Sequence, residues 1–120
     1  MDLIKLTAVA SDASEDLSLH VRGLIQKVRL VYSNNPGALS AVTLSAVEDG
    51  EGELIVNRPN SASNITLYPR RQVQDQAGNF LTLDGLRPLC EPYAVNGRLK
   101  LSLHQANPGG QCIAWVWLTR

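Results

Sequence analysis

The sequence holds few residues that could carry covalent chemistry, and they are scattered along the chain. Nucleophilic catalysis needs a Ser, Cys or Thr beside a base, and the only imidazole bases are His20 and His104. Each histidine falls on the expected polar face of a strand, where a surface histidine without a role would also lie. Outside the loop clusters the acids are Asp2, Asp75, Asp84 and Glu91. No role in a catalytic site has a clear candidate, so we expect that the protein is not an enzyme.

Metal-ligating residue types also form only weak patterns. The best candidate is the acidic loop Glu48 to Glu53, because carboxylates on a glycine-containing loop can wrap Ca²⁺. The loop lacks the register of an EF-hand, and a hairpin tip that blocks edge pairing is the better interpretation. Cys90 and Cys112 are far from a Cys-x-x-Cys spacing, and two cysteines cannot form a structural zinc site. We expect no metal, no cofactor and two free thiols; a disulfide stays open because the sequence gives no Cα separation.

Length and composition define the class of protein. The 120 residues correspond to one domain, and the 44% hydrophobic fraction is that of a chain that folds. Eleven basic and eleven acidic residues cancel, which argues against general binding to nucleic acid or to a membrane surface. No apolar run reaches the roughly 18 residues that cross a bilayer, and we identify no export signal. Residues 1–60 carry a net charge of −3 and residues 61–120 a net charge of +3. We expect strands from both halves to interleave and mix these charges.

The hydrophobic pattern is that of strands joined by turns. Leu99, Leu101 and Leu103 alternate with polar residues, which places one face of a strand in a core. Similar segments occupy residues 3–9, 17–21, 27–32, 40–47, 53–56 and 64–68. Asn96-Gly97 predicts a type I′ hairpin that joins residues 92–95 to the strand beginning at Leu99. We therefore predict an all-β, mainly antiparallel β-sandwich or jelly-roll-like barrel of about eight or nine short strands, in a single domain over residues 1–120.

The last strand is apolar on both faces. Ile113, Trp115 and Trp117 form one face, and Ala114, Val116 and Leu118 form the other. Such a strand lies centrally in a sandwich or buries its second face against another subunit. The central position is the simpler interpretation, and the alternative makes Trp115 and Trp117 an oligomer contact.

A longer passage carries a resemblance. It runs Tyr68-Pro69-Arg70-Arg71-Gln72-Val73-Gln74-Asp75-Gln76-Ala77-Gly78-Asn79, then Asp84-Gly85-Leu86-Arg87-Pro88-Leu89, Glu91-Pro92-Tyr93 and Asn96-Gly97-Arg98-Leu99-Lys100-Leu101. With Val21-Arg22-Gly23-Leu24-Ile25 before the strand at Lys27, it resembles the decoration, or cement, proteins of tailed-bacteriophage capsids. The two tryptophans and the acidic loop depart from that pattern.

The resemblance implies a virion protein made in the host cytoplasm, without enzymatic activity or cofactor, that lies on the outer capsid surface and stabilises the assembled head. Its partners would be the major capsid protein and further copies of itself, as a dimer or trimer, and neither nucleic acid nor a membrane. We expect Tyr68, Arg70, Arg71 and Arg87 to contact the shell, because Arg and Tyr anchor interfaces. The alternative for Arg70 or Arg87 is an ion pair with Asp75 or Asp84 that holds the loop from Val73 to Leu83.

Two other functions stay open from the sequence. A carbohydrate- or receptor-binding module of a tail fibre is possible because β-sandwiches often hold sugar sites lined by aromatic rings. Exposed coplanar rings among Trp115, Trp117, Tyr32 and Tyr93 would favour that module, and buried rings would favour a structural role. A head-completion or tail-tube protein is the third possibility, and ring formation would distinguish it.

Overall fold

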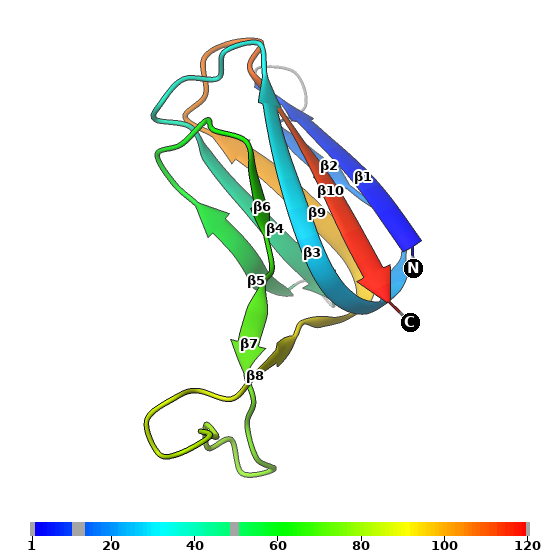
Figure 1. Ribbon diagram of the computed structural model, residues 1–120. Helices are drawn as coiled ribbons and strands as arrows, with labels where there is room; N and C mark the ends of the chain where they lie inside the picture. The colour runs from blue at the N-terminus through cyan, green and yellow to red at the C-terminus, as the bar shows by residue number, and fades with distance from the viewer. Residues whose placement is uncertain (1, 11–13, 49–50, 120) are drawn as a thin grey trace.

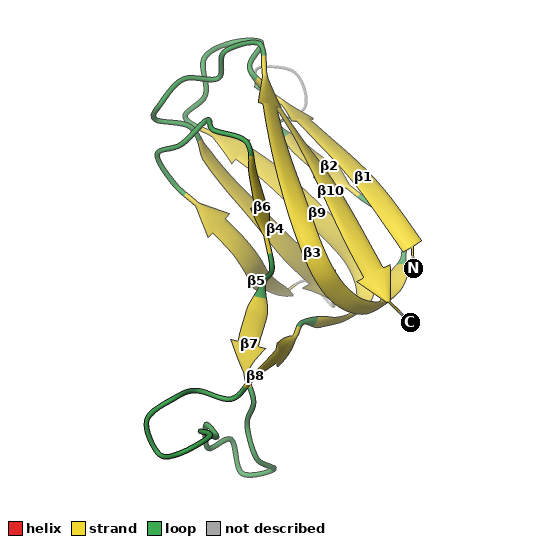
Figure 2. Cartoon of the chain, in the orientation of Figure 1, coloured by secondary structure: helices red, strands yellow, loops and turns green. Residues whose placement is uncertain are grey.

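The described chain is built from strands alone. The computed structural model describes residues 2–10, 14–48 and 51–119, and these contain no helix (Figure 2). The strands are β1 (Asp2–Val9), β2 (Glu15–Leu17), β3 (Val21–Ser33), β4 (Ala41–Glu48), β5 (Glu51–Arg58), β6 (Ile65–Leu67), β7 (Arg70–Gln72), β8 (Cys90–Pro92), β9 (Ala94–His104) and β10 (Gln111–Thr119). The predicted all-β class is confirmed.

Eight of these strands form two antiparallel layers (Figure 1). Sheet I has the order β1-β10-β3-β6, and sheet II has the order β2-β9-β4-β5. Every connection between consecutive strands of the two layers crosses from one sheet to the other, except the hairpin that joins β4 to β5. This order is that of a jelly roll, the more specific of the two predicted architectures.

The core lies between the two sheets and follows the predicted alternation. Leu99, Leu101 and Leu103 of β9 point inward and are buried, while the neighbouring Arg98 and His104 are exposed. The largest fully buried side chains come from both layers: Leu6, Ile25, Leu30, Leu44, Leu99, Leu101 and Leu118. The two halves of the sequence interleave, as expected, because β10 lies between β1 and β3, and β9 lies between β2 and β4.

The predicted hairpin at Asn96-Gly97 is wrong. Both residues lie inside the continuous strand β9, and neither has a positive φ. Asn96 pairs with Arg22 and Gly97 with Val21, both in β3, whereas Arg98 pairs with Val47 in β4. The strand therefore changes partner and passes from sheet I to sheet II at this point. A glycine at a strand bend permits close backbone approach, so the dipeptide marks a corner of the sandwich and not a turn.

The predicted strand over residues 17–21 is also interrupted. β2 ends at Leu17 and β3 begins at Val21, so the alternating segment spans the connection between the two sheets. Leu19 is 86% exposed in this connection, and Ser18 is buried where its hydroxyl accepts a hydrogen bond from Leu99 N, at 2.8 Å. The polar Ser18 is therefore buried and the apolar Leu19 faces solvent. The alternating pattern predicted the opposite arrangement.

β10 lies inside sheet I, between β1 and β3, as the simpler interpretation predicted, but only one of its faces is in the core. Its inward residues Ala114, Val116 and Leu118 are fully buried, and its outward Trp115 and Trp117 are half-buried.

Cys112 is buried on the inward face, Cys90 is exposed in β8, and both are free thiols. Residues 49–50, at the tip of the predicted acidic loop, and the side chains of residues 48, 51 and 52 lie outside the described part of the chain. The structure therefore does not test whether this loop binds a cation.

Candidate functional site

A two-stranded arm projects from one end of the sandwich (Figure 1). We define the arm as residues 70–92: β7 and β8 form its stalk, and residues 73–89 form its tip. β7 pairs antiparallel with β8, from Arg70 opposite Pro92 to Gln72 opposite Cys90. Every residue from 74 to 88 is exposed. The arm adds nothing to the core, so its side chains are free to contact something else.

Two arginines fix the stalk to the sandwich. Arg70 Nη1 donates hydrogen bonds to the carbonyl oxygens of Gln26, at 3.2 Å, and Pro69, at 2.7 Å. The Arg71 guanidinium lies 3.6 Å from the Glu53 carboxylate of β5 and 3.7 Å from the Glu91 carboxylate of β8. Arg71 therefore lies between carboxylates of β5 and β8, and these half-exposed pairs add weakly to the hydrogen bond by which Arg70 joins the stalk to β3.

The tip is closed by a cycle of backbone hydrogen bonds. Val73 N donates to Leu89 O at 2.7 Å, Leu89 N donates to Leu81 O at 3.1 Å, and Leu81 N donates to Val73 O at 2.8 Å. Two isolated antiparallel β-bridges, Gln74 with Phe80 and Thr82 with Pro88, each close a loop, one before Leu81 and one after it. The segment predicted as a long loop is thus a small unit whose central backbone groups are satisfied internally.

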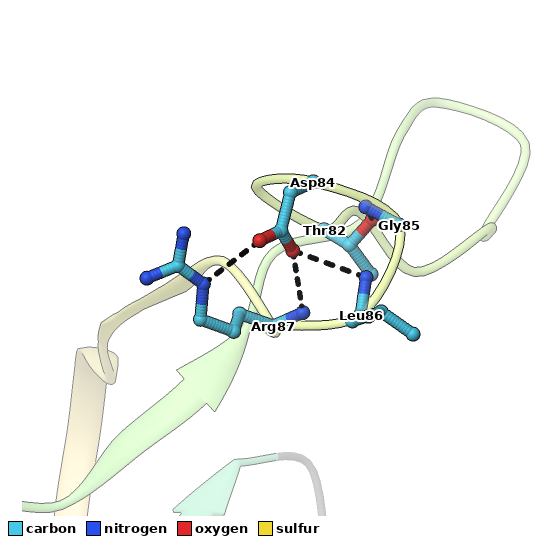
Figure 3. A network of polar contacts seen from close by, with 5 residues as sticks. All are labelled: Thr82, Asp84, Gly85, Leu86 and Arg87. Atoms are coloured by element: carbon cyan, nitrogen blue, oxygen red, sulfur yellow. Dashed lines mark hydrogen bonds and ion pairs between the residues drawn. The ribbon is translucent and has the colours of Figure 1, made fainter.

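An aspartate organises each of the two loops. Asp75 accepts hydrogen bonds from the backbone N–H groups of Ala77 and Asn79, both at 2.9 Å. Asp84 accepts hydrogen bonds from Leu86 N at 3.1 Å, Arg87 N at 2.9 Å and Arg87 Nε at 2.9 Å (Figure 3). These are Asx-type turns, in which a short carboxylate satisfies the backbone that follows it. The backbone donors of Arg87 and Asn79 lower the pKa of Asp84 and Asp75, respectively.

The tip presents apolar side chains to solvent. Leu86 is 88% exposed, Phe80 is 62% exposed and Leu83 is 61% exposed. Leu86 follows Gly85, whose φ of 83° is readily adopted by glycine and whose N–H donates to Thr82 Oγ1 at 2.9 Å (Figure 3). Exposed apolar side chains on a projecting element favour an interaction site, and holding them on ordered loops reduces the entropy lost on binding.

The four predicted shell contacts lie on the arm or at its base, in different settings. Tyr68 is 62% exposed just before β7, and Arg70 and Arg71 are engaged in the stalk. Arg87 pairs with Asp84, which is the loop-holding arrangement considered as its alternative, whereas Arg70 pairs with neither aspartate. Sequence reasoning missed Phe80, Leu83 and Leu86. Their signal was a group of four large apolar residues, Phe80, Leu81, Leu83 and Leu86, in a short segment between Gly78 and Pro88.

The other candidates from the sequence are not brought together. His20 and His104 are exposed, on the β2–β3 connection and at the end of β9 respectively. Among residues 2–10, 14–48 and 51–119, no three His, Cys, Asp or Glu side chains cluster as metal ligands would. Trp115 and Trp117 lie on the outer face of sheet I, with Lys5 Nζ 5.3 Å and Lys27 Nζ 4.4 Å from the respective ring centroids.

Acid is expected to loosen the tip. The pKa values of Asp84 and Asp75 are lower in the folded chain than in the unfolded chain, so their stabilisation is present above the unfolded value, near 4, and is lost as pH falls through the folded value. As pH falls from 6 to below 3, amide hydrogen exchange at Leu86 and Arg87, corrected for intrinsic rates, should accelerate about two- to threefold. Nuclear magnetic resonance of Asp84→Asn provides the control, because the variant should lose this pH dependence at both amides. An unchanged pH response in Asp84→Asn would contradict the assignment.

No family model matches the chain, and no curated protein or solved structure matches it either. Over the described residues, the structure contains no helix long and apolar enough to span a bilayer.

Proposed function

We propose that the protein is a bacteriophage capsid decoration protein that binds the assembled major capsid lattice through its arm and stabilises the head. The observation that carries this proposal is the projecting arm, with Leu86, Phe80 and Leu83 exposed on loops that Asp84 and Asp75 hold in place. The passage that resembles phage decoration proteins, from Tyr68 to Tyr93, corresponds to this arm and its base. The likeness and the geometry therefore support the same surface.

The architecture suits binding to a lattice. A ligand that binds the assembled shell but not free subunits favours assembly by RT ln(1 + [L]/Kd), about 2.7 kcal/mol per site at one hundred times Kd. The jelly roll supplies the base, and the backbone hydrogen bonds among Val73, Leu81 and Leu89 order the tip. A tip that is ordered before binding loses little freedom when it binds, so more of its contact energy remains as affinity.

A homo-oligomer would strengthen the same contact. A dimer or trimer on the outer virion surface would engage the shell with several arms at once, and avidity would rise without new chemistry. This gain requires that residues 74–88, which are exposed in the single chain, stay outside the contact between copies.

The carbohydrate-binding alternative has less support. Tyr32 is buried in the core, Tyr93 is partly buried, and lysine ammonium groups lie over the rings of Trp115 and Trp117. A sugar stacks on an open ring face, and these faces are engaged by cations. A clear hit on a glycan array would reverse this ranking.

The test adds purified protein to undecorated shells and measures co-sedimentation and the shell melting temperature. We expect saturable binding and a higher melting temperature. The matched control replaces residues 73–89 with a two-residue Asn-Gly turn, which retains the β7–β8 stalk and removes the tip. Circular dichroism first establishes that this variant unfolds at the same temperature as the parent. No binding by the parent protein would remove the proposal, and equal binding by both proteins would remove the role of the tip.

A further inference from the structure

The outer face of sheet I combines tryptophans with cations. Alternation places Trp115 and Trp117 on this face, opposite the buried Ala114, Val116 and Leu118. The register sets Trp115 between Lys5 of β1 and Arg29 of β3, and Trp117 between Leu3 and Lys27. Lys27, Trp117, Gln26, Tyr68 and Arg70 also line a groove of about 350 Å³ at the base of the arm. The face is therefore a basic and aromatic surface.

The cations on this face have no acidic partner among the described residues. The ion pairs of the described chain are those of Arg71 with Glu53 and Glu91, Arg87 with Asp84, and Lys100 with Glu15. Lys5 and Lys27 lie over indole rings, and Arg29 donates to Thr66 Oγ1 at 2.9 Å. The one acidic residue of the four strands of sheet I is Asp2, which has the inward parity of Leu6 and Ala8. Positive charge thus collects on one face of a chain whose net charge is zero.

From this arrangement we propose that the outer face of sheet I is a second binding surface, distinct from the arm, that docks an acidic protein surface. Three cations of sheet I, Lys5, Lys27 and Arg29, supply the charge complementarity. Such complementarity steers association and fixes orientation. The half-buried Trp115 and Trp117 supply the large rings that anchor protein interfaces. This inference does not depend on what the arm binds.

Two other occupants are disfavoured, the first by charge and the second by access to the rings. In a two-fold symmetric dimer through this face, the same patch would meet itself, so cations would oppose cations. Single-stranded nucleic acid stacks its bases on open aromatic faces, but the Trp117 ring has the Lys27 ammonium 4.4 Å from its centroid. An acidic protein surface would instead pair with the lysines and Arg29 and pack against the exposed parts of the two rings.

The test uses intrinsic fluorescence, because the only two tryptophans of the chain are on this face. The full-length protein is titrated with poly-L-glutamate, as a stand-in for an acidic protein surface, at low and at physiological salt. We expect a saturable change in tryptophan emission that weakens as salt increases. The double variant Lys27→Gln and Arg29→Gln should bind at least tenfold more weakly. The matched control, Arg98→Gln with Lys100→Gln, removes the same charge from sheet II and should bind like the parent.

Each alternative occupant has its own outcome. The proposal fails if poly-L-glutamate causes no saturable change, or if the two double variants lose affinity equally. It also fails if a DNA duplex or vesicles of anionic lipid bind more tightly than poly-L-glutamate under the same conditions. Self-association through this face would overturn it as well. Light scattering would detect that as an oligomer of the parent protein that Trp117→Ala abolishes without unfolding the chain.

Discussion

Leu86→Asp is expected to weaken adhesion to assembled shells by at least about thirtyfold, the effect of losing a contact worth about 2 kcal/mol, while the unfolding temperature stays unchanged. Leu86 is 88% exposed, so the folded chain buries little of this side chain and loses little when it changes. In a desolvated contact the same position would bury an unpaired carboxylate, which is costly. The measurement is the concentration of protein at half-saturation of undecorated shells, beside a thermal melt of each variant.

The matched control for this prediction is Leu19→Asp. Leu19 is 86% exposed on the connection between β2 and β3, so the substitution adds the same charge at the same exposure. We expect normal binding by Leu19→Asp. Equal weakening by both substitutions would indicate a general charge effect, and unchanged binding by Leu86→Asp would remove Leu86 from the contact.

The sequence predicted the parts of the fold that are governed by burial. Alternation in residues 98–104 identified β9, because a strand between a core and solvent must repeat every two residues. Residues 113–118, apolar on both faces, identified β10 as a strand inside a sheet. Prediction failed where long-range pairing overrides local preference. Asn96-Gly97 favours a turn in isolation, but pairing with Val21 and Arg22 keeps the strand extended through it. The resulting corner depends on the position of β3, which no local window contains.

The sequence indicated which segment forms the candidate site, but not which of its side chains are exposed and which are paired. The Pro-bounded segment from Tyr68 onward was identified as the contact region, yet Arg71 and Arg87 are engaged with Glu53, Glu91 and Asp84. Pairing of Arg71 with Glu53 joins residues far apart in sequence, so the local pattern could not reveal it. The exposed Leu86 was missed because large apolar residues are ordinarily assigned to a core. Only the three-dimensional closure of the tip shows that there is no core beside it.

The two cysteines should differ in reactivity by about a thousandfold or more. Burial raises the pKa of the Cys112 thiol to about 12 from 9.0, so near pH 8 it holds about a thousandth of the ordinary amount of thiolate, the reactive species. Cys112 pairs with Ala8 of β1 and Tyr32 of β3 and is fully buried in the core, so a reagent reaches it only when the sandwich opens. Cys90 is exposed on the stalk of the arm.

A disulfide reagent near pH 8 should therefore modify one thiol rapidly in the native protein and two in guanidinium. Peptide mapping should place the rapid label on Cys90, and Cys90→Ser should abolish the rapid phase, whereas Cys112→Ser should retain it. Equal rates for both thiols in the native state, or a rapid label on Cys112, would show that β10 does not hold this side chain within the core. Because β10 is the central strand of sheet I, that result would also undermine the position of Trp115 and Trp117 on its outer face.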